Sequence, residues 1–205
     1  MRKLILAPLA LAALALATPA LAVEKGDWTF SVGAHVVAPK SGNGSLAGGA
    51  LDADVGNDWR PTITAEYFFS PNLGLEILAA LPFEHDIKLN GVAAGSTKHL
   101  PPTVSLQYHF RNDSKVTPFV GAGVNYTAFF QEETTGPLAG TELSLDSSWG
   151  LAGHAGVDIE IGESKWLRID ARYIDIDTDV KVDGAAVGTV NIDPMVYGAA
   201  FVWSF

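Results

Sequence analysis

Histidine is the residue type in this sequence with the widest chemical range, because imidazole can bind metals and exchange a proton near neutral pH. The chain has five, which are His35, His85, His99, His109 and His154. No two are four residues apart, as ligands on one face of a zinc-binding helix would be, and the chain has no cysteine. The sequence therefore predicts neither a metal site nor a cofactor, and we expect His85 and His99 to be solvated.

His154 leaves one catalytic alternative open. It has the same parity as Ser148, Asp158 and Glu160 within a stretch of alternating residue types, and barrel enzymes that modify lipid use serine with histidine. A catalytic group of this kind is defined by its geometry, which residue spacing does not give. We therefore expect that the protein is not an enzyme, and a lipid-modifying enzyme stays as the less favoured alternative.

Charged residues also occur at alternate positions within otherwise apolar or small-residue stretches. They are Glu66, Glu76, Asp158, Glu160, Arg168, Asp170 and Arg172. Residues two apart share one face of a strand, so these side chains would gather on one side of a sheet. Because both signs are present, we expect them to pair and fill a narrow interior rather than form a selective ion path. In particular, Arg172 is expected to pair with Glu76 or Asp170.

The elements that must position these side chains are strands, because apolar residues alternate with small or polar residues along most of the chain. For example, Trp28, Phe30 and Val32 alternate with Thr29 and Ser31. Eight segments follow this pattern, at residues 28–36, 62–69, 73–83, 103–110, 120–127, 149–160, 167–173 and 195–205. The sequence therefore predicts an all-β domain with eight strands.

The links between the expected strands alternate in length. Short links with turn residues lie at 70–72, 111–116 and 162–165, and longer links rich in Gly, Asp and Asn lie at 39–58, 85–99, 131–145 and 177–191. Outer-membrane barrels have short periplasmic turns and longer extracellular loops. The pattern therefore predicts an eight-stranded antiparallel transmembrane β-barrel.

The first 22 residues have the three parts of a secretory signal. Arg2 and Lys3 form a basic head, an apolar run follows, and the segment ends in Ala20-Leu21-Ala22. The apolar run is too short to be kept as a membrane helix. We therefore expect a cleavable signal peptide at 1–22 and a single barrel domain at 23–205.

The balance of charges limits the partners of the chain. It has 13 Lys and Arg against 23 Asp and Glu, which argues against binding to nucleic acid. After the signal, no stretch approaches the ~20 consecutive apolar residues of a membrane helix, although 48% of the residues are hydrophobic. The strands must therefore carry this hydrophobic surface.

Three observations indicate which face of the expected barrel meets lipid. Aromatic residues gather near the ends of the apolar face, as in the interfacial girdles of membrane barrels; they are Trp28, Phe69, Phe110, Trp149, Tyr173 and Trp203. Eight strands enclose too little space for all of these rings. The charged residues lie mid-strand on the other face. Contact of these charges with lipid would be costly, so this face must point inward. The sequence therefore predicts a barrel in the outer membrane of a Gram-negative bacterium, and a soluble secreted barrel of the lipocalin type is the alternative.

Six segments carry a resemblance to a known family. They lie at 73–83, 99–103, 118–127, 146–150, 173–178 and 193–194. In order and spacing they resemble the outer membrane protein W (OmpW) family over nearly the whole chain after residue 22. The resemblance implies a barrel with a narrow, partly apolar lumen that passes small hydrophobic molecules across the outer membrane. A structural or adhesive surface barrel without transport is the alternative.

The resemblance also suggests residues for the lumen and for assembly. Leu78 matches a leucine that narrows the lumen in a relative, whereas Arg172 stands where that relative has tryptophan. The lumen constriction is therefore assigned to Leu78 and Arg172 together with Glu76 and Asp170. The aromatic end of the chain is similar to the signal read by the barrel-assembly machinery, and its residues are Tyr197, Phe201, Trp203 and Phe205. The implied partners are outer-membrane lipid, this machinery and small hydrophobic solutes.

Three prolines flank the link at 85–99. A symmetric hairpin about the middle of this link would place Pro82 beside Pro101, with Pro102 next along the strand. Proline has no amide hydrogen and so interrupts the ladder of a sheet. The sequence therefore predicts either an opening in the wall that serves as a lateral gate into lipid, or prolines that merely end the two strands.

Overall fold

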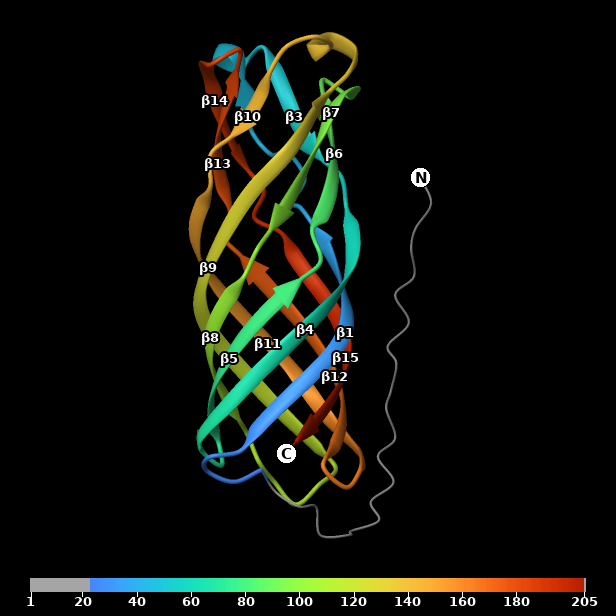
Figure 1. Cartoon of the computed structure of the whole chain (residues 1–205), viewed down its shortest axis with the longest axis vertical. Helices are drawn as coiled ribbons and strands as arrows, with labels where there is room; N and C mark the ends of the chain where they lie inside the picture. The colour runs from blue at the N-terminus through green and yellow to red at the C-terminus, as the bar shows by residue number, and fades with distance from the viewer. Residues whose placement is uncertain (1–22, 205) are drawn as a thin grey trace.

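The computed structural model describes residues 23–204, and antiparallel strands in it close into a barrel (Figure 1). The expected signal peptide and Phe205 lie outside the described residues. The wall consists of β1 (Trp28–Ala38), β4 (Asp58–Ser70), β5 (Leu73–Ala80), β8 (Thr103–His109), β9 (Val116–Thr134), β11 (Ser148–Gly162), β12 (Lys165–Ile174) and β15 (Met195–Ser204). Each strand pairs with the next, and β15 pairs back with β1. The predicted eight-stranded antiparallel barrel is confirmed.

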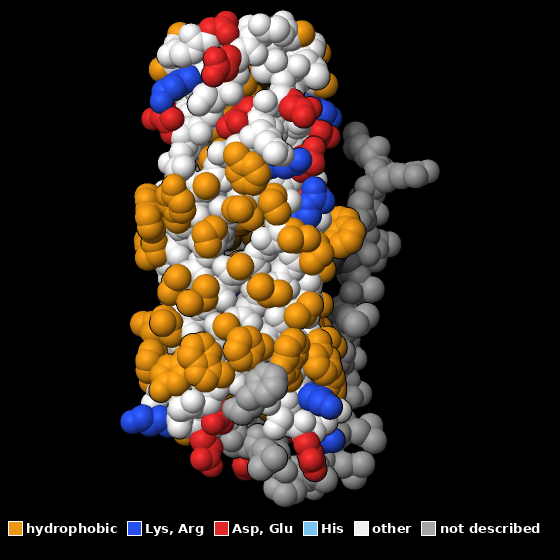
Figure 2. Space-filling view, in the orientation of Figure 1, with side chains coloured by type: hydrophobic (Ala, Val, Ile, Leu, Met, Phe, Trp, Pro, Cys, Tyr) orange, Lys and Arg blue, Asp and Glu red, His pale blue; other side chains and the backbone are white. Residues whose placement is uncertain are grey.

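The two faces of the wall differ as the alternation predicts. Along β1, Phe30 and Val32 point outward, whereas Thr29, Ser31 and His35 are buried in the lumen. On the face that Figure 2 shows, outward apolar side chains form a belt across the barrel, with charged residues beyond both of its edges. A closed barrel pairs its backbone groups internally, and the belt matches the hydrocarbon core of a bilayer. The strands therefore span the membrane with the apolar face in lipid.

The short links of the barrel are turns, but the segments expected as long loops contain further strands. They hold β2 (Ser45–Leu46), β3 (Leu51–Val55), β6 (Phe83–Leu89), β7 (Val92–Leu100), β10 (Leu143–Leu145), β13 (Asp177–Val182) and β14 (Ala185–Asn191). Two 3₁₀ turns, η1 (Ala47–Gly49) and η2 (Gly136–Leu138), accompany them. These extracellular segments are long, as predicted, and in most of them hairpins continue the wall past the apolar belt (Figure 1).

Two dipeptides explain the longest of these hairpins. Asn90 and Gly91 join β6 to β7 with φ angles of 50° and 77°, and Asp183 and Gly184 join β13 to β14 with the same two values. Positive φ at both central residues defines the tight type I′ turn, for which Asn-Gly and Asp-Gly are the preferred sequences. Each turn therefore fixes a two-residue connection, and alternating residues on either side extend it into paired strands.

Candidate functional site

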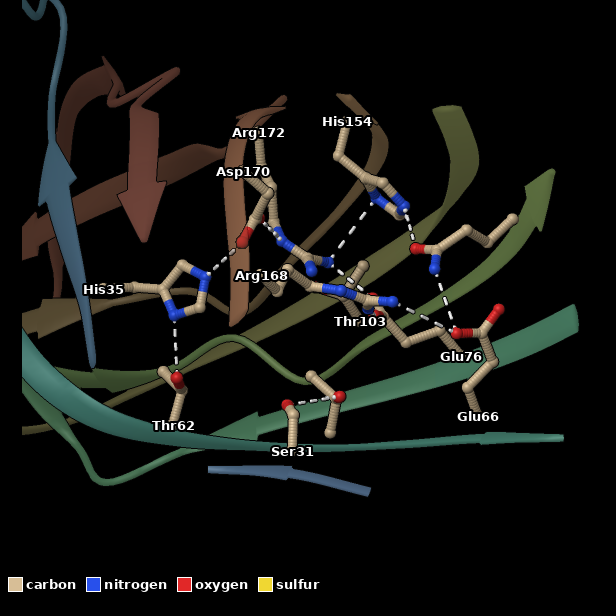
Figure 3. Close-up of polar contacts among 12 residues, drawn as sticks. Ser31, His35, Thr62, Glu66, Glu76, Thr103, His154, Arg168, Asp170 and Arg172 are labelled. Atoms are coloured by element: carbon tan, nitrogen blue, oxygen red, sulfur yellow. Dashed lines mark hydrogen bonds and ion pairs between the residues drawn. The ribbon is translucent and has the colours of Figure 1, made fainter. Parts of the chain in front are cut away.

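The inward face of the wall carries a network of buried ion pairs (Figure 3). Arg168 donates from Nε and Nη2 to the two carboxylate oxygens of Asp158, at 2.8 and 2.9 Å. Its Nη1 lies 2.8 Å from one oxygen of Glu76, and Arg172 Nη1 lies 2.7 Å from the other. Arg172 Nε also donates to Asp170, at 2.7 Å. Glu76 therefore joins the two guanidinium groups, and Arg172 pairs with both of the acids that the sequence suggested.

Histidines extend the network on both sides. His35 Nε2 lies 3.1 Å from Asp170, and its Nδ1 lies 2.7 Å from the Thr62 hydroxyl. At the other side, His109 Nε2 lies 2.9 Å from Glu66. Figure 3 shows the two guanidinium groups lying between His35 and Glu66. We call the six charged residues of this network, Glu66, Glu76, Asp158, Arg168, Asp170 and Arg172, the charged plug.

The charged plug crosses the lumen, because its members come from β4, β5, β11 and β12. Each buried charge is tolerated there because a partner of opposite sign lies within 3.5 Å. Leu78, which the resemblance assigns to the constriction, lies on the same inward face of β5 as Glu76 and is buried. Glu160, the remaining charge expected inside, is only half-buried and lies outside the charged plug.

The residues of the catalytic alternative have other partners. His154 Nε2 lies 2.8 Å from the Gln107 carboxamide oxygen, and His154 Nδ1 lies 3.5 Å from Arg172 Nη1. The Ser148 hydroxyl accepts a hydrogen bond from the Asp177 amide at 3.1 Å. Within residues 23–204, no hydrogen bond joins Ser148 to His154. A serine–histidine pair is therefore not assembled here.

Glycine makes room for the largest side chains of the lumen. A Cβ atom added to Gly198 on β15 would lie 2.0 Å from Cδ2 of His35. An added methyl group would push His35 away from Asp170, and overpacking a well-packed interior costs about 1–3 kcal/mol. We expect Gly198→Ala to lower the unfolding free energy by that amount, measured in urea with the barrel in detergent. Gly153→Ala is the control, because a Cβ at Gly153 meets nothing within 4 Å; equal midpoints for the two variants would contradict the close packing of His35.

An apolar cluster closes the periplasmic mouth. Val23, Phe68, Trp166 and Val202 are all buried and pack together at the end that carries the short turns. The Phe68 ring lies 5.1 Å from the ring of His109 in the network above it. The periplasmic end of the lumen is therefore blocked first by this cluster and then by the charged plug.

A cavity of about 180 Å³ lies at the opposite, extracellular end, inside the hairpins that extend the wall. Branched aliphatic side chains from β2, β3, β6, β10, β13 and β14 line it, among them Leu46, Leu51, Ile87, Leu143, Val180 and Val190. They belong to the largest apolar cluster of the described chain. Sequence reasoning missed this cavity because its walls come from four separate segments, each expected to be a loop.

His85 and His99 lie beside this cavity, and their predicted solvation was wrong. They are 2% and 0% exposed, and their Nε2 atoms are 3.0 Å apart. His85 Nδ1 lies 2.5 Å from the Gly56 carbonyl oxygen, and the Phe129 ring stacks on His99. Both histidines belong to the extracellular hairpin β6–β7, where burial lowers the pKa of His85 and holds the pKa of His99 well below its usual range. Both are therefore neutral at neutral pH.

Among residues 23–204, one group of carboxylates lies close enough together to hold a cation. Asp175 and Asp177, where β12 leads into β13, converge with Asp193, which lies just before β15. The Lys40 ammonium already lies 2.6 Å from Asp193. Although burial raises the pKa of Asp193, the hydrogen bonds from Lys40 and from the Ile176 amide lower it overall. Lysine therefore supplies a positive charge to this group.

The wall is interrupted where the barrel meets the β6–β7 hairpin. The β5–β8 ladder ends at Leu78 opposite Thr103, and the β6–β7 ladder begins at Phe83 opposite His99. Four residues lie between these pairs on one side and three on the other, and neither ladder includes them. We call residues 79–82 and 100–102 the proline seam, because they do not pair with each other, although Ala79 and Ala80 pair with β4 and Leu100 pairs with β9. Figure 2 shows a small hollow in the apolar belt, near the place where β5, β6, β7 and β8 meet in Figure 1.

Two sequence expectations about the proline seam need correction. The hairpin does not pair Pro82 with Pro101, since the two ladders differ in register by one residue and both stop short of the prolines. Phe83, expected on the outward face, is instead 2% exposed and points inward. The chain turns after Leu81, so the parity of β5 does not continue into β6. Each edge of the proline seam is hydrogen-bonded to the neighbouring strand on its far side. Leu81 N donates to Pro61 O of β4, and Tyr126 N of β9 donates to Pro102 O, both at 3.1 Å.

Comparisons with known proteins agree with this architecture. The model of the OmpW family matches residues 24–205. Outer membrane protein W of Vibrio cholerae serotype O1 is similar at 37% identity, covering 96% of this chain and 97% of that protein. The crystal structure of the outer membrane protein OprG from Pseudomonas aeruginosa is similar with a TM-score of 0.80 and 31% identity, covering 91% of this chain and 99% of that chain. A more distant relative, 27% identical over 86% of this chain and 88% of its own length, is the dibenzothiophene metabolism operon protein PahQ of Pseudomonas aeruginosa.

Proposed function

The chain belongs to the OmpW family of Gram-negative outer-membrane barrels, and on this premise we propose that it carries small hydrophobic molecules into the outer membrane. One observation carries the proposal: an apolar cavity at the extracellular end lies above a closed lumen, and the β6–β7 hairpin that forms part of its wall begins at an interruption of the barrel. Molecules enter the cavity from outside and leave sideways through the proline seam into lipid.

The cavity supplies the driving force for entry. Its lining is almost entirely aliphatic, so a hydrophobic solute gains about 25 cal/mol for each Å² of apolar surface that it removes from water. A dry apolar cavity of about 150 Å³ in another protein binds benzene. A cavity of about 180 Å³ suits molecules of the size of one aromatic ring or a short alkyl chain.

The charged plug directs the solute away from the lumen. An apolar molecule passing downward would have to separate Arg168 from Asp158 and Arg172 from Glu76, and it offers no replacement hydrogen bonds. In this proposal Arg172, Glu76 and Asp170 close the lumen together with Leu78. The apolar cluster around Val23 and Phe68 closes it a second time.

The proline seam supplies the exit. Pro82, Pro101 and Pro102 have no amide hydrogen to offer across it, so no backbone hydrogen bond between the two strands must break. The outward surface at the seam is apolar, and Leu81 there is 58% exposed toward lipid. A hydrophobic solute therefore moves from one apolar environment to another, which avoids the aqueous periplasm.

Two further features agree with the proposal. The name of the relative PahQ connects that protein with the metabolism of dibenzothiophene, an apolar aromatic compound. The proposal also assigns no catalytic step, in keeping with the separate partners of Ser148 and His154. For assembly, Tyr197 and Phe201 point toward lipid on β15, and we propose that this aromatic strand is read by the barrel-assembly machinery.

Uptake by whole cells tests the proposal. Cells that make the protein are expected to take up toluene several times faster than cells that lack it. Val187→Trp fills the cavity and should remove most of this difference, whereas Val92→Trp, the same change at a side chain that is 56% exposed and does not line the cavity, should not. Both variants must first give the folded form on a gel. Equal uptake with and without the protein would refute the proposed function.

A further inference from the structure

Aromatic side chains lie between the apolar cavity and the proline seam. Along the β6–β7 hairpin, the ladder pair next to the seam is Phe83 with His99, and the following pair on the same, inward face is His85 with Thr97. His85 and Thr97 belong to the wall of the cavity, whereas Phe83 and His99 do not. Phe83 and His99 therefore form the layer that separates the cavity from the seam.

The rings of this layer pack closely against one another. The centroid of the His99 ring lies 5.5 Å from that of Phe83 and 5.8 Å from that of Phe129, which reaches the cavity from β9. Phe83 also stacks on His85, at 6.4 Å. We call Phe83, His85, His99 and Phe129 the aromatic layer. Because Phe83 and His99 are both buried, a solute that moves along this inward face toward the seam must displace a ring.

The rings of the aromatic layer are not equally free to move. His85 Nδ1 bonds the Gly56 carbonyl oxygen, and its Nε2 lies 3.0 Å from Nε2 of His99, so rotating either imidazole would break a buried hydrogen bond. The Phe83 ring has no polar atom and is held by packing alone. It also directly follows Pro82, in the seam where the two strands are not paired. Phe83 is therefore the ring that can rotate at the least cost.

We propose that the Phe83 ring is the gate between the cavity and the proline seam, and that its rotation admits a hydrophobic solute to the lateral exit. The inference rests on the proposed function and names the step that controls its rate. Ala80, which belongs to the seam, packs against the same apolar cluster as Phe83, so a solute that passes the ring stays among apolar groups. Water gains no hydrogen bond from the Phe83 ring, so the closed gate also keeps it out of the seam.

Two substitutions of Phe83 should change the uptake of toluene by whole cells in opposite directions. Phe83→Trp enlarges the ring and should slow uptake several-fold. Phe83→Ala removes the ring and should speed uptake by up to about tenfold, the effect of one lost contact between aromatic rings. Each rate is divided by the amount of folded form on a gel. If Phe83→Ala does not fold, Phe83→Leu takes its place, because leucine also removes the ring but keeps an apolar side chain.

Binding to the cavity is measured separately, from the NMR methyl signals of Ile87 and Val190 as toluene is added to the barrel in lipid nanodiscs. Phe83→Trp should keep the parental affinity, because Phe83 does not line the cavity, whereas Val187→Trp should lower affinity and uptake together. Phe119→Ala is the matched control. It removes an equally buried ring, which lies over Arg168 in the lumen, and it should change neither the affinity nor the uptake per folded barrel.

The outcomes also distinguish this inference from the function on which it rests. If the tryptophan and alanine variants both keep the parental rate, or both lower it, Phe83 only packs the interior and is not the gate, although the protein still carries toluene. If toluene shifts neither methyl signal of the parent barrel, the cavity binds no small hydrophobic molecule and the proposed function fails with the gate.

Discussion

Arg168→Met should lower the unfolding free energy of the barrel by about 3–5 kcal/mol, which is the usual cost of removing one partner from a buried ion pair. Arg168 lies within 2.8 Å of both Asp158 and Glu76, and 3.5 Å from Glu66. Methionine fills a similar volume but leaves these carboxylates with too little positive charge in a closed lumen. The loss would be read from urea unfolding in detergent and from the fraction of folded form on a gel.

Two further variants show whether charge is the cause. Lys165→Met removes a positive charge from an exposed site on the same strand, and it should change stability by less than about 0.5 kcal/mol. Adding Asp158→Asn and Glu76→Gln to Arg168→Met should recover part of the loss, because the unpaired carboxylates are then neutral. A single variant as stable as the parent would mean that the charged plug does not depend on Arg168.

Replacing all three prolines of the seam should reduce uptake of toluene at least tenfold, toward that of cells without the protein. In Pro82→Thr/Pro101→Val/Pro102→Thr, amide hydrogens become available on both sides, so the strands can pair across residues 79–82 and 100–102. The offset of one residue between the flanking ladders can be absorbed by a β-bulge. Hydrogen exchange should then show new protection of the amides at 82 and 101, because the backbone of residue 102 faces Tyr126 on β9 instead.

Controls for the sealed barrel separate the exit from the cavity. Pro118→Val replaces a proline of β9 near the periplasmic end and should leave uptake unchanged. The affinity of the cavity for toluene should also be unchanged in the sealed barrel, because the prolines do not line the cavity. This affinity is measured by titrating toluene against the NMR methyl signals of Ile87 and Val190, with the barrel in lipid nanodiscs. A sealed barrel that inserts normally, shows the new protection and still takes up toluene at the parental rate would exclude the lateral route.

The strands of the barrel and the direction of their faces could be predicted from the sequence, because a period of two reports which side chains share a face. This holds for β1, where Phe30 and Val32 meet lipid and His35 lies inside. The alternation of inward and outward side chains along β5 does not continue past the turn after Leu81. The sequence pattern therefore predicts the wrong face for Phe83. The extracellular hairpins could have been found, since Asn90-Gly91 and Asp183-Gly184 are strong turn signals between alternating residues.

The site itself was only partly predictable. Parity placed Arg172 on the same face as Glu76 and Asp170, and these ion pairs are present. It did not give the height of each residue in the lumen, so the central position of Arg168, which reaches Glu76 across 92 positions of sequence, was missed. The cavity was missed for a related reason: hydrophobic residues from distant hairpins converge there, and no local pattern records that contact.

The unpaired state of the proline seam has a consequence for the kinetics of release. Along the proposed route, a solute does not wait for strands to separate, a collective motion of microseconds or longer. It requires rotations of side chains, which at an exposed position such as Leu81 take picoseconds to nanoseconds. The barrier to release along this route therefore contains no term for broken backbone hydrogen bonds across the seam. In the proposed function, the direction of net flux is then set by the supply of solute at the extracellular mouth and by its dilution into lipid, and it requires no energy source.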